Sequence, residues 1–101
     1  MLARLAMRYK KDQDIYFHRE LLIRSPQDRN IDLITISSHD GKLEIQESFI
    51  HESLFPMRDW EPRAFKFRQN KPIVLLTARV HPGETPASHS MNGVIKFLLD
   101  K

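Results

Sequence analysis

The chain has 101 residues and a mass of 11.9 kDa, which suits one small domain or part of a larger one. It contains no cysteine, so a disulfide framework, a cysteine-based zinc finger and a thiol catalyst are excluded. Hydrophobic residues make up 41% of the chain, too many for an intrinsically disordered protein. No apolar run reaches the length of about 20 residues that a membrane span needs, so no membrane association is expected.

The net charge of +3 is spread unevenly. Residues 1–11 carry four basic side chains and no acidic one, whereas the remainder is close to neutral, so a nucleic-acid-binding surface is not indicated. A second basic stretch, residues 63–79, contains no acid and five basic side chains, namely Arg63, Lys66, Arg68, Lys71 and Arg79. It is either a solvated face or a surface that attracts an acidic partner.

The first half of the chain predicts a helix followed by a hairpin. Apolar residues from Leu2 to Tyr9 recur at the spacing of one helical face, so residues 2–10 are expected to be helical. An acid-free amphipathic start is also typical of a mitochondrial transit peptide, but this one has few serines. Residues 16–24 and 31–38 have strand patterns, and the Ser-Pro-Gln-Asp-Arg-Asn sequence between them is turn chemistry.

The middle of the chain is harder to interpret. Asp40-Gly41 predicts a turn, and residues 42–70 predict a long connection with brief strands near residues 43–45 and 64–67. We expect Trp60 to anchor this connection.

A strand, a sharp turn and a helix are predicted next. Residues 73–78, Ile-Val-Leu-Leu-Thr-Ala, form a continuous apolar run typical of a strand that is buried on both faces. From Ala87 to Leu98, apolar residues recur along one helical stripe. Thr85 suits the helix N-cap, and Pro86 suits the first helical position.

His81 and Glu84 lie in the turn between that strand and that helix. Imidazole and carboxylate groups are both zinc ligands, and the intervening Pro-Gly bend would let them converge on one point. A ligand site at the carboxyl end of a buried strand is typical of open α/β sheets. The alternative is a loop histidine and a loop glutamate that pair with each other or with solvent.

The other histidines are not expected to complete this site. His18 lies in a predicted strand and is expected to pair or pack, whereas His39 and His51 are expected to be solvated. His89 is five residues from Glu84, a spacing that does not stack on one helical face. Arg79 is expected to form an ion pair with a nearby acid.

Residues 78–88, Ala-Arg-Val-His-Pro-Gly-Glu-Thr-Pro-Ala-Ser, closely resemble the zinc-binding segment of the cytosolic carboxypeptidases, zinc metallocarboxypeptidases that remove glutamates from tubulin and other proteins. Residues 16–22 and 31–38 resemble the first two strands of that family's catalytic domain. The resemblance covers most of residues 16–100. Asp28 departs from it, because the family more often has Gly before Arg29.

The resemblance implies an α/β fold that is part of a mixed-sheet zinc carboxypeptidase, arranged as helix, β-hairpin, buried strand and helix. Residues 1–15 would be a helical lead-in, and residues 16–101 would be the N-terminal portion of the catalytic domain, truncated at Lys101. His81 and Glu84 match the first two ligands of one zinc ion. The third ligand, the general base and the substrate-holding residues would follow beyond Lys101, so the chain alone is expected to be inactive.

The resemblance further implies a cytoplasmic deglutamylase whose partners are polyglutamylated or acidic-tailed proteins such as tubulin. Two other hypotheses remain open at this stage. One is a non-catalytic module that binds acidic tails through residues 63–79, and the other is a truncated product without autonomous function.

Overall fold

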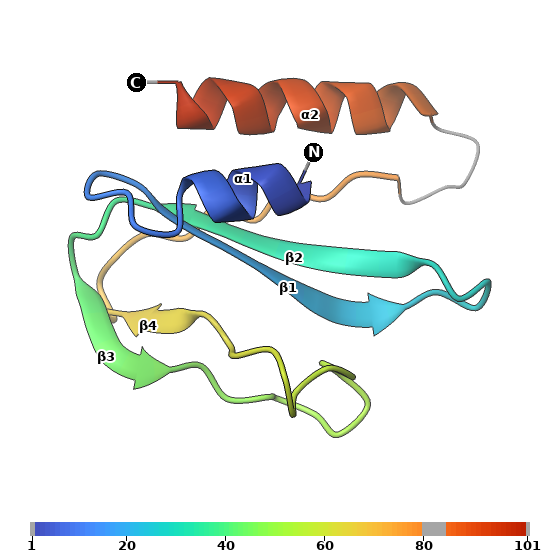
Figure 1. Ribbon diagram of the computed structural model, residues 1–101, viewed down its shortest axis with the longest axis horizontal. Coiled ribbons are helices and arrows are strands. Elements are labelled where there is room, and N and C mark those ends of the chain that lie inside the picture. Colours follow the sequence, from blue (N-terminus) through green and yellow to red (C-terminus); the bar gives the residue numbers. More distant parts are fainter. Residues whose placement is uncertain (1, 80–84, 101) are drawn as a thin grey trace. The chain divides into compact units, whose positions relative to one another are not determined.

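The computed structural model describes residues 2–79 and 85–100. These residues form two helices and two two-stranded antiparallel sheets, a small α/β architecture (Figure 1). In chain order the elements are α1 (Leu2–Arg8), β1 (Tyr16–Arg24), β2 (Asn30–Ser37), β3 (Lys42–Gln46), β4 (Phe65–Phe67) and α2 (Thr85–Leu99). The chain divides into two compact units, Met1–Lys71 and Pro72–Lys101. No helix among the described residues is long and apolar enough to cross a membrane.

Helix α1 confirms the predicted N-terminal helix, although it ends two residues earlier than expected. Tyr9 follows it and is buried, with its ring centroid 6.2 Å from that of Phe17 on β1. The chain then turns at Asp12, whose Oδ1 accepts hydrogen bonds from the backbone N–H groups of Asp14 and Ile15. This turn, which the Asp12 side chain stabilises, directs the backbone into β1.

Strands β1 and β2 pair antiparallel, which confirms the predicted hairpin. Asp28 N–H donates to the Ser25 carbonyl at 2.8 Å, and Ser25 N–H donates to the Arg29 carbonyl at the same distance. Asp28 itself has a φ of 61°. A turn followed by one left-handed residue is a common three-residue hairpin loop, and glycine is the favoured residue at its left-handed position.

The second sheet pairs β3 with β4, whose pairing the sequence pattern did not predict (Figure 1). The predicted Asp40-Gly41 turn connects β2 to β3, with Lys42 N–H donating to the His39 carbonyl at 3.1 Å. Gly41 has a φ of 77°, which the third position of a type II turn requires. Side chains from one face of β1 contact this second sheet, and they are described with the site below.

The long connection between β3 and β4 is anchored by Phe55, so the prediction that Trp60 is its anchor was wrong. Phe55 is only 3% exposed, and its N–H donates to the Leu22 carbonyl of β1 at 2.8 Å. Trp60 is 75% exposed. Aromatic size alone did not identify the anchor, because Phe55 is held through its backbone as well as through its ring.

Residues 73–78 form no strand, and their prediction as a buried strand was wrong. Ile73 is 92% exposed, and Val74 and Leu75 are nearly as exposed. An apolar run signals a preference for burial, but a strand also needs a neighbour for its backbone hydrogen bonds, and the described residues provide none. Helix α2 begins at Thr85 as predicted, although Val94 and Leu98 of its apolar stripe are exposed.

Candidate functional site

The predicted zinc ligands, His81 and Glu84, lie outside the described residues. The structure describes what flanks them: a segment without regular secondary structure that ends at Arg79, and helix α2 starting at Thr85. Their role as metal ligands therefore stays a prediction. Among residues 2–79 and 85–100, no group of three or more His, Cys, Asp or Glu side chains could hold a metal ion.

The donor set of His81 and Glu84 suits zinc, because one imidazole and one carboxylate occur together in catalytic zinc sites. Such sites use three protein ligands and leave a fourth position for water or substrate. His81 and Glu84 would therefore supply two of the three protein ligands that such a site uses.

Arg79, next to the predicted ligand segment, reaches toward α2. Its Nη1 donates a hydrogen bond to the Ser88 hydroxyl at 3.3 Å. The Arg79 backbone has a φ of 62°, in the left-handed region. Arg79 and Ser88 thus connect the two sides of the segment that contains His81 and Glu84.

The four other histidines behave differently from one another. His18 packs as predicted: it stacks against Tyr16, and its Nε2 lies 3.0 Å from the Pro62 carbonyl oxygen. His51 is exposed, as expected, and His89 is exposed too. His39 was expected to be solvated but is partly buried, with Nε2 at 2.9 Å from the Asp12 carbonyl oxygen and its ring edge-on to Tyr16.

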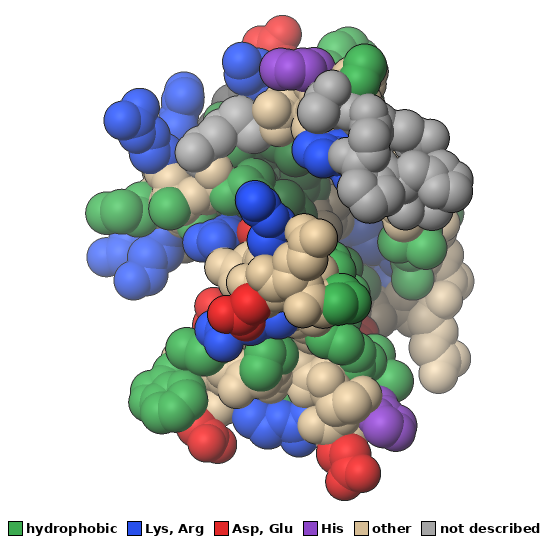
Figure 2. Space-filling view, turned by 90° about the vertical axis from the view of Figure 1, so that its right-hand side faces the viewer, with side chains coloured by type: hydrophobic (Ala, Val, Ile, Leu, Met, Phe, Trp, Pro, Cys, Tyr) green, Lys and Arg blue, Asp and Glu red, His purple; other side chains and the backbone are tan. Residues whose placement is uncertain are grey.

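Two of the basic side chains in the stretch 63–79 form ion pairs with acidic side chains. Arg63 is buried and paired with Glu20, and Arg68 Nη1 lies 2.6 Å from Asp40 Oδ2. The Arg68 guanidinium holds the pKa of the Asp40 carboxyl below its usual value. Figure 2 shows basic and acidic side chains interspersed with hydrophobic ones on one face. These pairings disfavour the hypothesis of an acidic-tail module built on this stretch.

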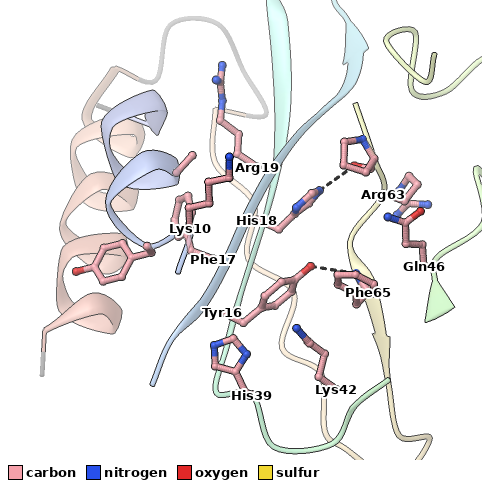
Figure 3. A pocket seen from close by; sticks show the side chains of 13 residues that line it. Lys10, Tyr16, Phe17, His18, Arg19, His39, Lys42, Gln46, Arg63 and Phe65 are labelled. Atoms are coloured by element: carbon pink, nitrogen blue, oxygen red, sulfur yellow. Dashed lines mark hydrogen bonds between the residues drawn. The ribbon is translucent and has the colours of Figure 1, made fainter. Parts of the chain in front are cut away.

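A polar seam, made by Tyr16, His18 and Glu20 of β1, holds residues 61–65 against the hairpin. The three side chains share one face because they alternate along the strand. The Tyr16 hydroxyl accepts a hydrogen bond from Phe65 N–H at 3.0 Å, and the His18 ring contacts the Pro62 carbonyl (Figure 3).

The third contact of the polar seam is a buried ion pair. Arg63 Nε donates to Glu20 Oε1 at 2.7 Å, and the two side chains are 6% and 2% exposed. The Arg63 guanidinium also lies over the Phe55 ring and donates to the Ser48 carbonyl. Sequence reasoning missed this pair, because its partners are 43 residues apart and nothing local links them.

A pocket of about 300 Å³ opens beside the polar seam (Figure 3). Residues 16–19 of β1 line it, together with residues from the end of α1, from β3 and from the segment before β4. Its charged lining side chains are all basic, namely Lys10, Arg19, Lys42 and Arg63. No motif in the sequence pointed to this pocket.

Comparison with known proteins finds that the chain is similar to cytosolic carboxypeptidases from several organisms. Human cytosolic carboxypeptidase-like protein 5 is 47% identical over 85 residues, which are 84% of this chain and 9% of the human protein. The zebrafish (Danio rerio) protein of the same name is 42% identical over 89 residues, 88% of this chain and 10% of that protein. Cytosolic carboxypeptidase 6 of Caenorhabditis elegans is 40% identical over 86 residues, 85% of this chain and 14% of that protein.

The chain is homologous to the cytosolic carboxypeptidases. It spans about a tenth of the length of these relatives. Any stretch of 85 residues within 101 includes residues 17–85, so the region matched to the human protein contains His81 and Glu84. No protein-family model matches the chain.

Proposed function

We propose that this chain is the N-terminal portion of the catalytic domain of a cytoplasmic zinc metallocarboxypeptidase that removes glutamate from acidic protein tails such as that of tubulin. Residues 1–15 would be the lead-in, and residues 16–101 would belong to the mixed-sheet fold. The observation that carries the proposal is the 47% identity to a cytosolic carboxypeptidase over a region that contains the His-Pro-Gly-Glu segment.

In this proposal His81 and Glu84 hold one zinc ion, and a third protein ligand comes from outside this chain. When bound, zinc polarises the scissile carbonyl and lowers the pKa of its water. The chain's own contribution to zinc binding would be the imidazole of His81 and the carboxylate of Glu84. Arg79 Nη1 donates a hydrogen bond to the Ser88 hydroxyl, so the two described flanks of the ligand segment are linked.

A chimeric enzyme tests the proposal. The matched region of human cytosolic carboxypeptidase-like protein 5 would be replaced by the aligned region of this chain, and glutamate release from a polyglutamate peptide would be measured. The chimera is expected to release glutamate, and His81→Ala or Glu84→Ala is expected to reduce the rate by at least about a hundredfold, because each removes a metal ligand.

His89→Ala is the matched control, since His89 is exposed on α2 and should leave the rate unchanged. The isolated 101-residue chain, assayed beside the chimera, should release no glutamate. An active isolated chain, or a chimera that is insensitive to His81→Ala and Glu84→Ala, would refute the proposal.

A further inference from the structure

The pocket lies along one edge of β1. Four consecutive residues, Tyr16 to Arg19, line it, and their side chains point alternately to the two faces of the strand. No residue of β2 lines it, although every residue of β2 is described. The pocket therefore wraps around the outer edge of β1, the edge that faces away from β2.

Part of the backbone along this outer edge has no hydrogen-bond partner among the described residues. Leu21 N–H points away from β2, because it donates to the Glu61 carboxylate at 2.8 Å. Residues two and four positions earlier, Arg19 and Phe17, have the same orientation in an antiparallel ladder, so their N–H and C=O groups face the same edge. Among the described residues, no hydrogen bond from another segment reaches the backbone of Phe17 or Arg19 there.

The side chains around the edge are basic on both faces. Lys10 follows α1 on one side of β1, and Lys42 of β3 lies on the other (Figure 3). Neither lysine forms an ion pair with a described residue. Lys42 Nζ lies 4.8 Å from the Phe65 ring centroid and 5.4 Å from that of Tyr16, which holds its charge beside the pocket.

We propose that an extended acidic peptide segment of a partner protein binds here as an additional strand on the outer edge of β1. Backbone pairing with Phe17 and Arg19 would provide the strand contacts, as in other cases of strand addition. Neighbouring residues of a strand point to opposite faces, so two consecutive acidic side chains would reach Lys10 and Lys42. This binding needs neither zinc nor the His81 and Glu84 side chains, so it stands or falls independently of the proposed catalytic function.

Fluorescence polarisation tests the proposal on the full chain without zinc. The probe is a labelled peptide in which pairs of glutamates alternate with pairs of threonines. Lys10→Gln/Lys42→Gln should weaken its binding about three- to tenfold, the loss expected from two partly exposed charge pairs. The matched control is Lys11→Gln/Lys66→Gln, which removes the same charge outside the pocket and should change affinity less than twofold. The Lys42→Arg variant keeps the charge and should bind the peptide as tightly as the parent chain. A loss of binding confined to the Gln variants therefore reflects the lost charge and not misfolding.

Two further peptides test the backbone and the charge. A peptide with alternate amides N-methylated loses the donors that strand pairing requires, so its binding should be lost. A peptide with glutamine in place of glutamate should also bind poorly. Equal losses in the pocket and control double variants would overturn the proposal, and so would undiminished binding of the N-methylated peptide.

Discussion

Asp28 adopts a left-handed backbone conformation, because the three-residue hairpin loop between β1 and β2 requires one at that position. A left-handed conformation costs an L-residue about 1–2 kcal/mol, somewhat less for Asp than for most others. Glycine would adopt this conformation without that cost. The left-handed conformation of Asp28 therefore carries a cost in stability.

Asp28→Gly is therefore expected to raise the free energy of unfolding by up to about 1 kcal/mol, and Asp28→Val to lower it by about 1–2 kcal/mol. The measurement is urea unfolding followed by far-ultraviolet circular dichroism at low protein concentration. Equal stability of the Val and Gly variants would show that residue 28 is not left-handed in solution.

Tyr16 makes the polar seam sensitive to alkali. Burial raises the pKa of the Tyr16 hydroxyl, the hydrogen bond from Phe65 N–H acts to lower it, and the negative charge of Glu20 raises it further, with burial dominant. In the unfolded chain the hydroxyl ionises near its usual pKa of 10.0, so above that pH the unfolded state binds fewer protons than the folded state. Stability contributed by neutral Tyr16 is therefore present below about pH 10 and is lost as the pH rises above it.

Tyr16→Phe should remove this part of the alkaline destabilisation. At pH 7 the variant should be about 1 kcal/mol less stable than the parent, because Phe65 N–H loses its acceptor. Unfolding midpoints at pH 7 and pH 11 measure both effects. A stability difference between parent and variant that does not shrink at pH 11 would contradict the assignment.

At the scale of elements, the Glu20–Arg63 pair connects β1 to the segment before β4. Arg63→Met should destabilise the first unit by about 3–5 kcal/mol, because it leaves Glu20 buried without its counter-charge. Glu20→Leu combined with Arg63→Met should recover most of that loss, because no charge then remains buried. Chemical unfolding of the single and double variants measures the coupling, and additive losses would show that the two residues act independently.

The exposed segment 73–78 should make copies of this chain associate with one another. It is uncharged, apolar and without a pairing partner among the described residues, which favours intermolecular strand pairing. Sedimentation velocity should show oligomers of the parent at tens of micromolar and a monomer for Val74→Lys/Leu76→Lys. Val94→Lys/Phe97→Lys on α2 is the matched control, since it also changes two exposed apolar residues but within a helix. Equal dissociation by both pairs would contradict a strand-mediated association.

Local sequence signals predicted the elements whose physics is local. Helical spacing from Leu2 to Tyr9, the turn residues 25–30 and the Asp40-Gly41 turn each correspond to an observed element. The β3–β4 pairing and the polar seam were not predicted, because their partners lie about 20 to 50 residues apart. The prediction of a buried strand at residues 73–78 was wrong for another reason. Hydrophobicity indicates a preference for burial, but it does not supply a neighbouring strand.

At the scale of the whole molecule, the chain combines a hairpin unit with a segment that carries two zinc-type donors. Its homology to the cytosolic carboxypeptidases extends across both parts, since the matched region spans at least residues 17–85. The central claim is that His81 and Glu84 act together on one zinc ion and need a third ligand from elsewhere.

Calorimetric titration of the chain with Zn²⁺ tests this claim most directly. Two protein ligands should give a dissociation constant weaker than about a micromolar, since complete sites use three. His81→Ala and Glu84→Ala should each weaken that binding further, whereas His89→Ala should leave it unchanged. Binding at one zinc per chain with micromolar or tighter affinity, or binding that survives both His81→Ala and Glu84→Ala, would contradict the account.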